Sequence, residues 1–96
     1  MQHKSNILRR VHVGRMIAMI CMAGPDGIRN IDLQRNLGVG RTTIQHWVVT
    51  LRQEYGAPIT FSDKGYHWRP RPDQRKRAQA IIDVFCEPIT GKGENE

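Results

Sequence analysis

Short clusters of glycine and proline constrain the fold of this chain more than any other feature of its sequence. They occur at residues 24–27 (Gly-Pro-Asp-Gly), 38–40 (Gly-Val-Gly) and 56–58 (Gly-Ala-Pro), and two further prolines stand at positions 70 and 72. Glycine and proline end helices and favour turns, so no long element is expected to run through these clusters. A chain of 96 residues divided in this way is expected to form one compact domain of short elements.

Three of the segments between these clusters repeat apolar residues at helical spacing. The repeats predict a helix over residues 6–23, a short helix over 30–37 and a longer helix over 41–55. Asn30 is expected to cap the second helix, Gly38 to end it, and Gly40 to cap the third. The second and third helices, joined by a three-residue turn, match the geometry of a helix-turn-helix.

The segment after residue 58 alternates apolar and polar residues as strands do. It predicts a hairpin with strands 59–61 and 66–68 and a four-residue tip at 62–65. Tyr66 and Trp68 lie on one face of the second strand and are expected in the core, and Ile28 and Arg29 are expected to pair briefly with the hairpin. The predicted fold class is mainly α with a small β-hairpin wing and a C-terminal helix.

Charge is distributed unevenly along the chain. Residues 1–77 carry 14 Lys or Arg against 5 Asp or Glu, whereas residues 78–96 carry 1 against 4. Most of the cations are arginine, whose planar fork suits phosphates and guanine edges. Nucleic acid is therefore the leading candidate partner.

The third helix offers the side chains expected to meet DNA. With its apolar face used for packing, its other residues are free to enter a major groove, where Gln45 suits adenine and Arg41 suits guanine or a phosphate. The lysine at the hairpin tip is exposed in any arrangement of the strands. The predicted DNA-binding residues are Arg41, Thr42, Thr43, Gln45, His46, Arg52 and Lys64.

Several stretches of the chain resemble the winged helix-turn-helix of the biotin-repressor and deoxyribonucleoside-repressor type. The resemblance covers about residues 14–69 and rests on residues 33–44, 51–52, 55–59 and 64–68, with Gly-Ala-Pro-Ile at 56–59 as its most specific part. It implies a three-helix core with a β-wing, DNA recognition by the second helix of the motif, and backbone or minor-groove contact by the wing tip. The chain departs from that family at Gln34, where a small residue is usual, and at Gly40, where Ser or Thr is usual.

The segment after Pro72 predicts a fourth helix, capped by Asp73 and ending before Pro88. Its apolar stripe consists of Ala78, Ile81, Ile82 and Phe85. The stripe requires a cover, which is either the first helix of the same chain or the same helix of a second copy. We favour a homodimer joined through the stripe, because a second copy would supply a second DNA half-site.

The sequence favours no other chemistry. Cys21 and Cys86 lack partners at metal-ligand spacing, and neither a recognisable nucleophile setting nor a phosphate loop is present, so we expect no enzymatic activity, metal, cofactor or small-molecule ligand. The longest apolar run is far shorter than the roughly 20 residues of a membrane span. With no secretion signal recognised, a cytoplasmic location is expected.

These expectations divide the chain into a DNA-binding domain over 1–69, a C-terminal helix over 70–87 and a disordered tail over 88–96. The leading interpretation is a small transcriptional regulator of a phage or another mobile element that binds double-stranded DNA. An accessory or architectural DNA-binding protein in recombination or packaging is an alternative. A second alternative is a protein-binding module in which the side of the third helix with Trp47 and Val49 meets another protein.

Overall fold

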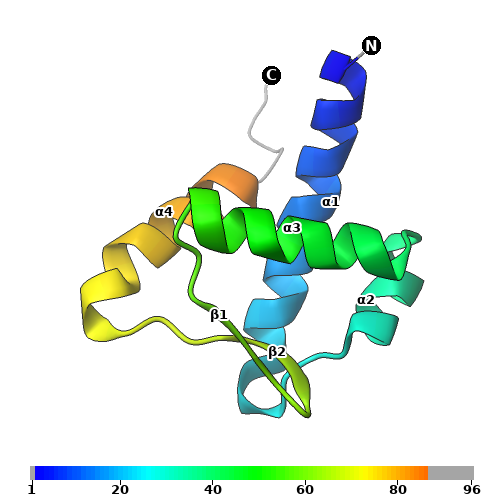
Figure 1. Cartoon of the computed structure of the whole chain (residues 1–96). Coiled ribbons are helices and arrows are strands. Elements are labelled where there is room, and N and C mark those ends of the chain that lie inside the picture. Colours follow the sequence, from blue (N-terminus) through cyan, green and yellow to red (C-terminus); the bar gives the residue numbers. More distant parts are fainter. Residues whose placement is uncertain (1, 87–96) are drawn as a thin grey trace.

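The computed structural model describes residues 2–86, with side chains placed from residue 11 onward; the predicted tail over 88–96 lies outside this part. Its elements are α1 (Gln2–Ala23), α2 (Asn30–Leu37), α3 (Arg41–Glu54), β1 (Ile59–Ser62), β2 (Gly65–Trp68) and α4 (Arg75–Phe85), with single 3₁₀ turns at Gly24–Asp26 and Pro72–Gln74. Figure 1 shows α3 crossing in front of α1, with the hairpin descending from the C-terminal end of α3. The predicted fold class, mainly helical with a small antiparallel hairpin, is confirmed.

The core forms where α1 meets the other helices and the hairpin. Met16, Ile17 and Ile20 of α1 are fully buried, as are Leu33 of α2 and Ile44 of α3. Each such side chain contributes roughly 1.5–3 kcal/mol relative to an exposed one. These residues belong to the apolar repeats, which is why the periodicity identified the helices correctly.

Two helix starts differ from their predictions. The structure extends α1 back to Gln2 rather than Asn6, in keeping with a stretch that contains neither glycine nor proline before Gly14. The N-cap of α2 is Arg29, in extended conformation, and Asn30 is the first helical residue. The Asn30 side chain instead donates to the Tyr66 hydroxyl at 3.2 Å and accepts from the Gln34 amide at 2.6 Å. Asn30 therefore ties α2 to the hairpin, and the unusual Gln34 is accommodated by hydrogen bonding along the helix.

The hairpin has a tighter tip than predicted. Ser62 pairs with Gly65, so only Asp63 and Lys64 lie between the strands. Gly65 has a φ of +115°, a conformation that side chains rarely adopt. A Cβ at this position would also meet the carbonyl oxygen of Ile28. Glycine at 65 thus allows both the turn and the close approach of the segment that follows α1.

The hairpin is anchored to the body by the predicted pairing of Ile28. Ile28 and Tyr66 exchange two backbone hydrogen bonds, of 3.0 and 2.8 Å. Tyr66 is buried as predicted, Trp68 is half-buried, and His67 on the opposite strand face is buried as well. The His67 Nε2 atom lies 2.7 Å from the Ser62 hydroxyl oxygen. Both faces of β2 are therefore covered, which strand alternation alone did not predict.

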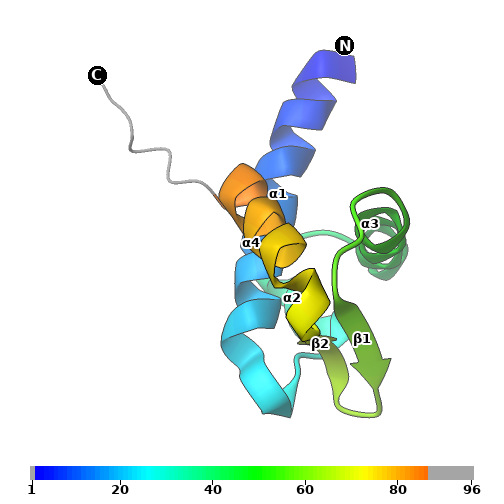
Figure 2. The same cartoon turned by 90° about the vertical axis from the view of Figure 1, so that its left-hand side faces the viewer.

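The apolar stripe of α4 packs within the chain, and the prediction that Ala78 and Ile81 face a second copy is wrong. Both are buried, and α4 lies against α1 (Figure 2). Ile82 and Phe85 are half-buried and pack against the same core, so their part in a dimer stays a prediction. The alternative cover, the first helix of the same chain, accounts for the stripe.

The N-terminal end of α4 also differs from its prediction. The helix begins at Arg75 after one 3₁₀ turn, and Gln74 rather than Asp73 is its N-cap. The Gln74 side chain accepts a hydrogen bond from the Arg71 backbone N–H at 2.9 Å. Asp73 lies 3.5 Å from the Arg71 guanidinium instead of capping the helix.

The contact between α1 and α4 depends on Gly14. A Cβ at this position would collide with the Phe85 carbonyl oxygen, so only glycine allows the end of α4 to approach the α1 backbone. The Cys86 thiol donates to the Gly14 carbonyl oxygen at 3.2 Å. Burial, reinforced by nearby Cys86, raises the pKa of Cys21 to about 11. Both cysteines are free thiols, and burial raises the pKa of Cys86 as well.

Candidate nucleic-acid interface

Helix α3 is positioned by the glycines on either side of the turn before it. Gly38 ends α2 in the left-handed conformation, with φ +68°, and its N–H donates to the Gln34 carbonyl oxygen. Gly40 is the N-cap of α3, in extended conformation and without a side-chain cap. Both residues have the roles that the sequence predicts. The turn directs the apolar side of α3 into the core and leaves its other side in solvent.

The predicted contact residues of α3 lie on that solvent side, with one exception. Arg41, Thr42, Gln45, His46 and Arg52 are exposed, and Thr43 is half-buried. Arg41, Gln45 and Arg52 follow one another at helical spacing and form a single stripe. The sequence analysis therefore identified a continuous surface of α3, although Thr43 stands at its margin.

Trp47 belongs to the core rather than to this surface. It is 6% exposed, and the His12 ring of α1 stacks on it with centroids 6.2 Å apart. The predicted alternative of a protein-binding face used Trp47 together with Val49. Only Val49 of that pair is exposed, so the face lacks its larger apolar residue.

The hairpin tip carries the remaining predicted contact. Lys64 is exposed, and its backbone N–H donates to the Ser62 hydroxyl at 3.1 Å. Phe61 of β1 is 70% exposed, and it pairs with Tyr66, whose ring lies 5.3 Å from its own between centroids. Figure 2 shows α3 and the hairpin on the same side of the molecule, with α1 on the other. We refer to the solvent side of α3 together with the hairpin as the α3–hairpin face.

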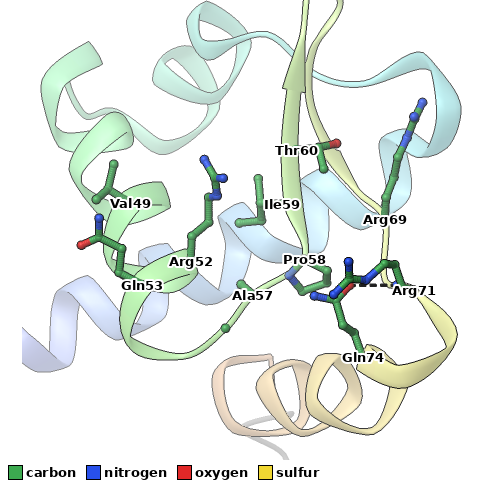
Figure 3. A pocket seen from close by; sticks show the side chains of 11 residues that line it. Val49, Arg52, Gln53, Ala57, Pro58, Ile59, Thr60, Arg69, Arg71 and Gln74 are labelled. Carbon is green, nitrogen blue, oxygen red and sulfur yellow. Dashed lines mark hydrogen bonds between the residues drawn. The ribbon is translucent and has the colours of Figure 1, made fainter.

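A groove of about 530 Å³ lies between the C-terminal half of α3, β1 and the segment that follows β2. Its lining includes Arg52, Arg69 and Arg71, and no acidic residue. In Figure 3, Arg52 extends from α3 on one side of β1 and Arg69 from the segment after β2 on the other. Arg69 and Arg71 were not among the residues predicted to bind DNA, although they stand on either side of Pro70, directly after a predicted strand.

Most cations of the α3–hairpin face form no ion pair with an acidic side chain of residues 11–86. Among the side chains of residues 11–86, one ion pair is formed, between Arg71 and Asp73, and both of its side chains are more than two-thirds exposed. Arg41, Arg52 and Lys64 therefore keep their charge and their N–H donors for an external anion.

Other kinds of site find no support in the part of the chain that the structure describes. Within it, no three His, Cys, Asp or Glu side chains gather as metal ligands. None of its helices has the length and apolar character needed to cross a bilayer.

Comparisons with protein-family models, with curated proteins and with solved structures found no match to this chain.

Proposed function

We propose that this protein binds double-stranded DNA through the α3–hairpin face and acts as a small transcriptional regulator in the cytoplasm. One observation carries the proposal: an exposed polar stripe on α3 and a lysine at the hairpin tip lie on the same side of the molecule, and their cations form no ion pair with a described acidic side chain. An α-helix fits the major groove, and a hairpin beside it reaches the adjacent backbone or minor groove. The resemblance to winged helix-turn-helix domains favours the same assignment.

Each element has a distinct role in this proposal. Arg41 and Gln45, in the first turns of α3, read base edges, for which their forked or amide side chains are suited. Thr42 and His46 line the same groove, and Lys64 contacts a phosphate. Base contacts provide discrimination between sequences, whereas phosphate contacts provide affinity for any duplex.

The burial of Trp47 favours DNA over a protein partner for the solvent side of α3. A protein interface usually centres on a large aromatic or arginine anchor surrounded by apolar contacts. The exposed part of α3 offers mainly polar and cationic side chains with Val49 as its one exposed aliphatic residue. Charge and polarity of this kind match a polyanion.

The test is a titration of fluorescent duplex DNA, followed by anisotropy, at about 50 and about 200 mM salt. Phosphate contacts release counterions, so six contacts would reduce affinity about 10³-fold over this range. Selection of bound sites from a random duplex library then identifies the preferred sequence. Affinity that does not change with salt, or no binding to any duplex, would refute DNA binding by this face.

A further inference from the structure

The groove between α3 and the hairpin is lined by positively charged side chains that take no part in the proposed base contacts. Three arginines line it, from α3 and from the segment after β2, and no acidic side chain does. Its floor is formed by residues 58–60, where Thr60 presents an exposed hydroxyl. A hollow with cations and hydrogen-bond donors and without carboxylates is suited to a polyanion.

We propose that this groove holds a stretch of DNA phosphodiester backbone between Arg52 and Arg69, flanking the bases read by α3. This inference rests on the proposed function and deepens it, because it assigns a separate set of residues to affinity rather than to sequence. In Figure 3 the two side chains stand on opposite sides of β1 and point in the direction in which the hairpin extends. Such a pair clamps a linear chain of phosphates from both sides.

The length of α3 places Arg52 at the backbone rather than at the bases. Arg41 and Arg52 are eleven residues apart on the same stripe, which is about 16 Å along a helix axis. When α3 enters the major groove by its N-terminal end, so that Arg41 reaches base edges, Arg52 lies outside the groove, where phosphates stand.

Arg71 is expected to contact the DNA backbone less strongly than Arg52 and Arg69. Its guanidinium lies 3.5 Å from the Asp73 carboxylate, and both groups are exposed. An exposed pair of this kind is screened by solvent and readily exchanged. Replacing Asp73 by Asn removes the competing carboxylate and should increase affinity for every duplex about two- to fivefold, from roughly 0.4–1 kcal/mol of exposed pairing.

The experiment compares the whole chain with its R52Q/R69Q variant in anisotropy titrations on the preferred duplex and on a random duplex of the same length. We expect the variant to lose about tenfold in affinity for each arginine on both duplexes. The slope of the logarithm of the binding constant against the logarithm of the salt concentration, the salt slope, should become flatter by about two. The matched control is Arg15→Gln, since Arg15 is exposed on α1 at a helical position opposite its buried residues. The control should leave both quantities unchanged, and thermal unfolding followed by circular dichroism should be the same for all three proteins.

A second arm leaves the protein unaltered and neutralises the DNA instead. Single methylphosphonates placed along the preferred duplex should identify one short run of phosphates at which wild-type binding weakens and R52Q/R69Q binding does not. Two results would refute a backbone contact in the groove and leave the proposed function in place. One is the absence of such a run of phosphates. The other is equal affinity of the variant and the wild-type protein while Arg41→Ala still weakens binding. Failure of the wild-type protein to bind any duplex would overturn both. If the protein binds single-stranded DNA more tightly than a duplex of the same length, the groove binds unpaired strands, and the proposal that it holds the backbone of duplex DNA is wrong.

Discussion

Two hollows of nearly equal size flank the C-terminal half of α3, and they differ in charge rather than in volume. The groove toward the hairpin measures about 530 Å³ and is lined by three arginines without an acid. The hollow toward α4 measures about 560 Å³ and combines Lys76 and Arg77 with Glu54 and Asp73. Size therefore does not favour either hollow as a binding surface, whereas charge composition favours the groove toward the hairpin for the proposed contact with DNA.

Both hollows have buried core residues beneath them, and they differ in their exposed side chains. Below the α3–α4 hollow, Ile81 is buried in the common core, and Tyr55 contacts Phe85 edge-to-face with ring centroids 5.3 Å apart. The groove beside the hairpin also has buried core residues in its lining, Ala57 and Ile59, but its three arginines are exposed. We expect substitutions on the α4 side to change stability and substitutions on the hairpin side to change affinity.

The largest effect is expected on the α4 side. Ile81→Ala should lower the free energy of unfolding by about 2–5 kcal/mol, because it removes a buried side chain and leaves a cavity. Val84→Ala, at a half-exposed position on the same helix, is the control and should change stability by about 0.5 kcal/mol or less. Urea unfolding at several protein concentrations measures both values. A stability that rises with protein concentration would show that a second copy covers this helix.

The next largest effect is expected on base recognition. Arg41→Ala and Gln45→Ala should each weaken binding to the preferred duplex by about 1–3 kcal/mol more than binding to random DNA. Competition titrations with the two duplexes give the difference directly. Equal losses on both would reassign these side chains to phosphate contacts.

A smaller effect is expected when one lysine charge is removed from either the hairpin side or the α4 side. Lys64→Ala at the hairpin tip should flatten the salt slope by about one, because one phosphate contact is lost. Lys76→Ala, at the α3–α4 hollow, removes the same charge from the other side and should leave the slope unchanged. The same change in slope for both variants would indicate that only net charge matters.

The smallest effect concerns pH and the α1–α4 contact. Burial raises the pKa of Cys21 from 9.0 to about 11, so the unfolded chain releases this proton first as pH increases. Its contribution is fully present below pH 9 and is lost between pH 9 and about 11. The loss should be about 1 kcal/mol or less, because solvent reaches the half-buried thiol. Urea unfolding across this pH range should show a shallower decline for Cys21→Ala than for the wild-type protein.

The sequence predicted elements better than it predicted how they meet. Helices with repeated apolar residues, and the glycines that end or begin them, were placed correctly because local backbone preferences and one-sided burial determine both. The stripe of α4 showed only that the helix requires a cover. Which helix provides the cover depends on Gly14, and a glycine in mid-helix gives no sign of the backbone that approaches it.

The candidate site shows the same division. Exposure of Arg41, Gln45 and Lys64 follows from helical phase and from a position in a turn, so the sequence was sufficient. Arg69 was missed because it lines the same groove as Arg52 only through the path of the hairpin, which brings together segments distant in the chain. His67 was missed because a two-stranded sheet normally leaves one face in solvent, whereas here both faces of β2 are covered.

The anchoring of the hairpin would affect the entropy of the proposed association with DNA. Two backbone hydrogen bonds join Ile28 to Tyr66, and the short contact between Ser62 and His67 links the strands close to the tip. In the proposed complex with DNA, a hairpin anchored by these contacts would leave little more than the Lys64 side chain to be ordered, at about 0.5–1.5 kcal/mol. A free loop would lose about 1–2 kcal/mol for each backbone residue that it orders. Loosening the anchor should therefore weaken association even though every contact residue is retained.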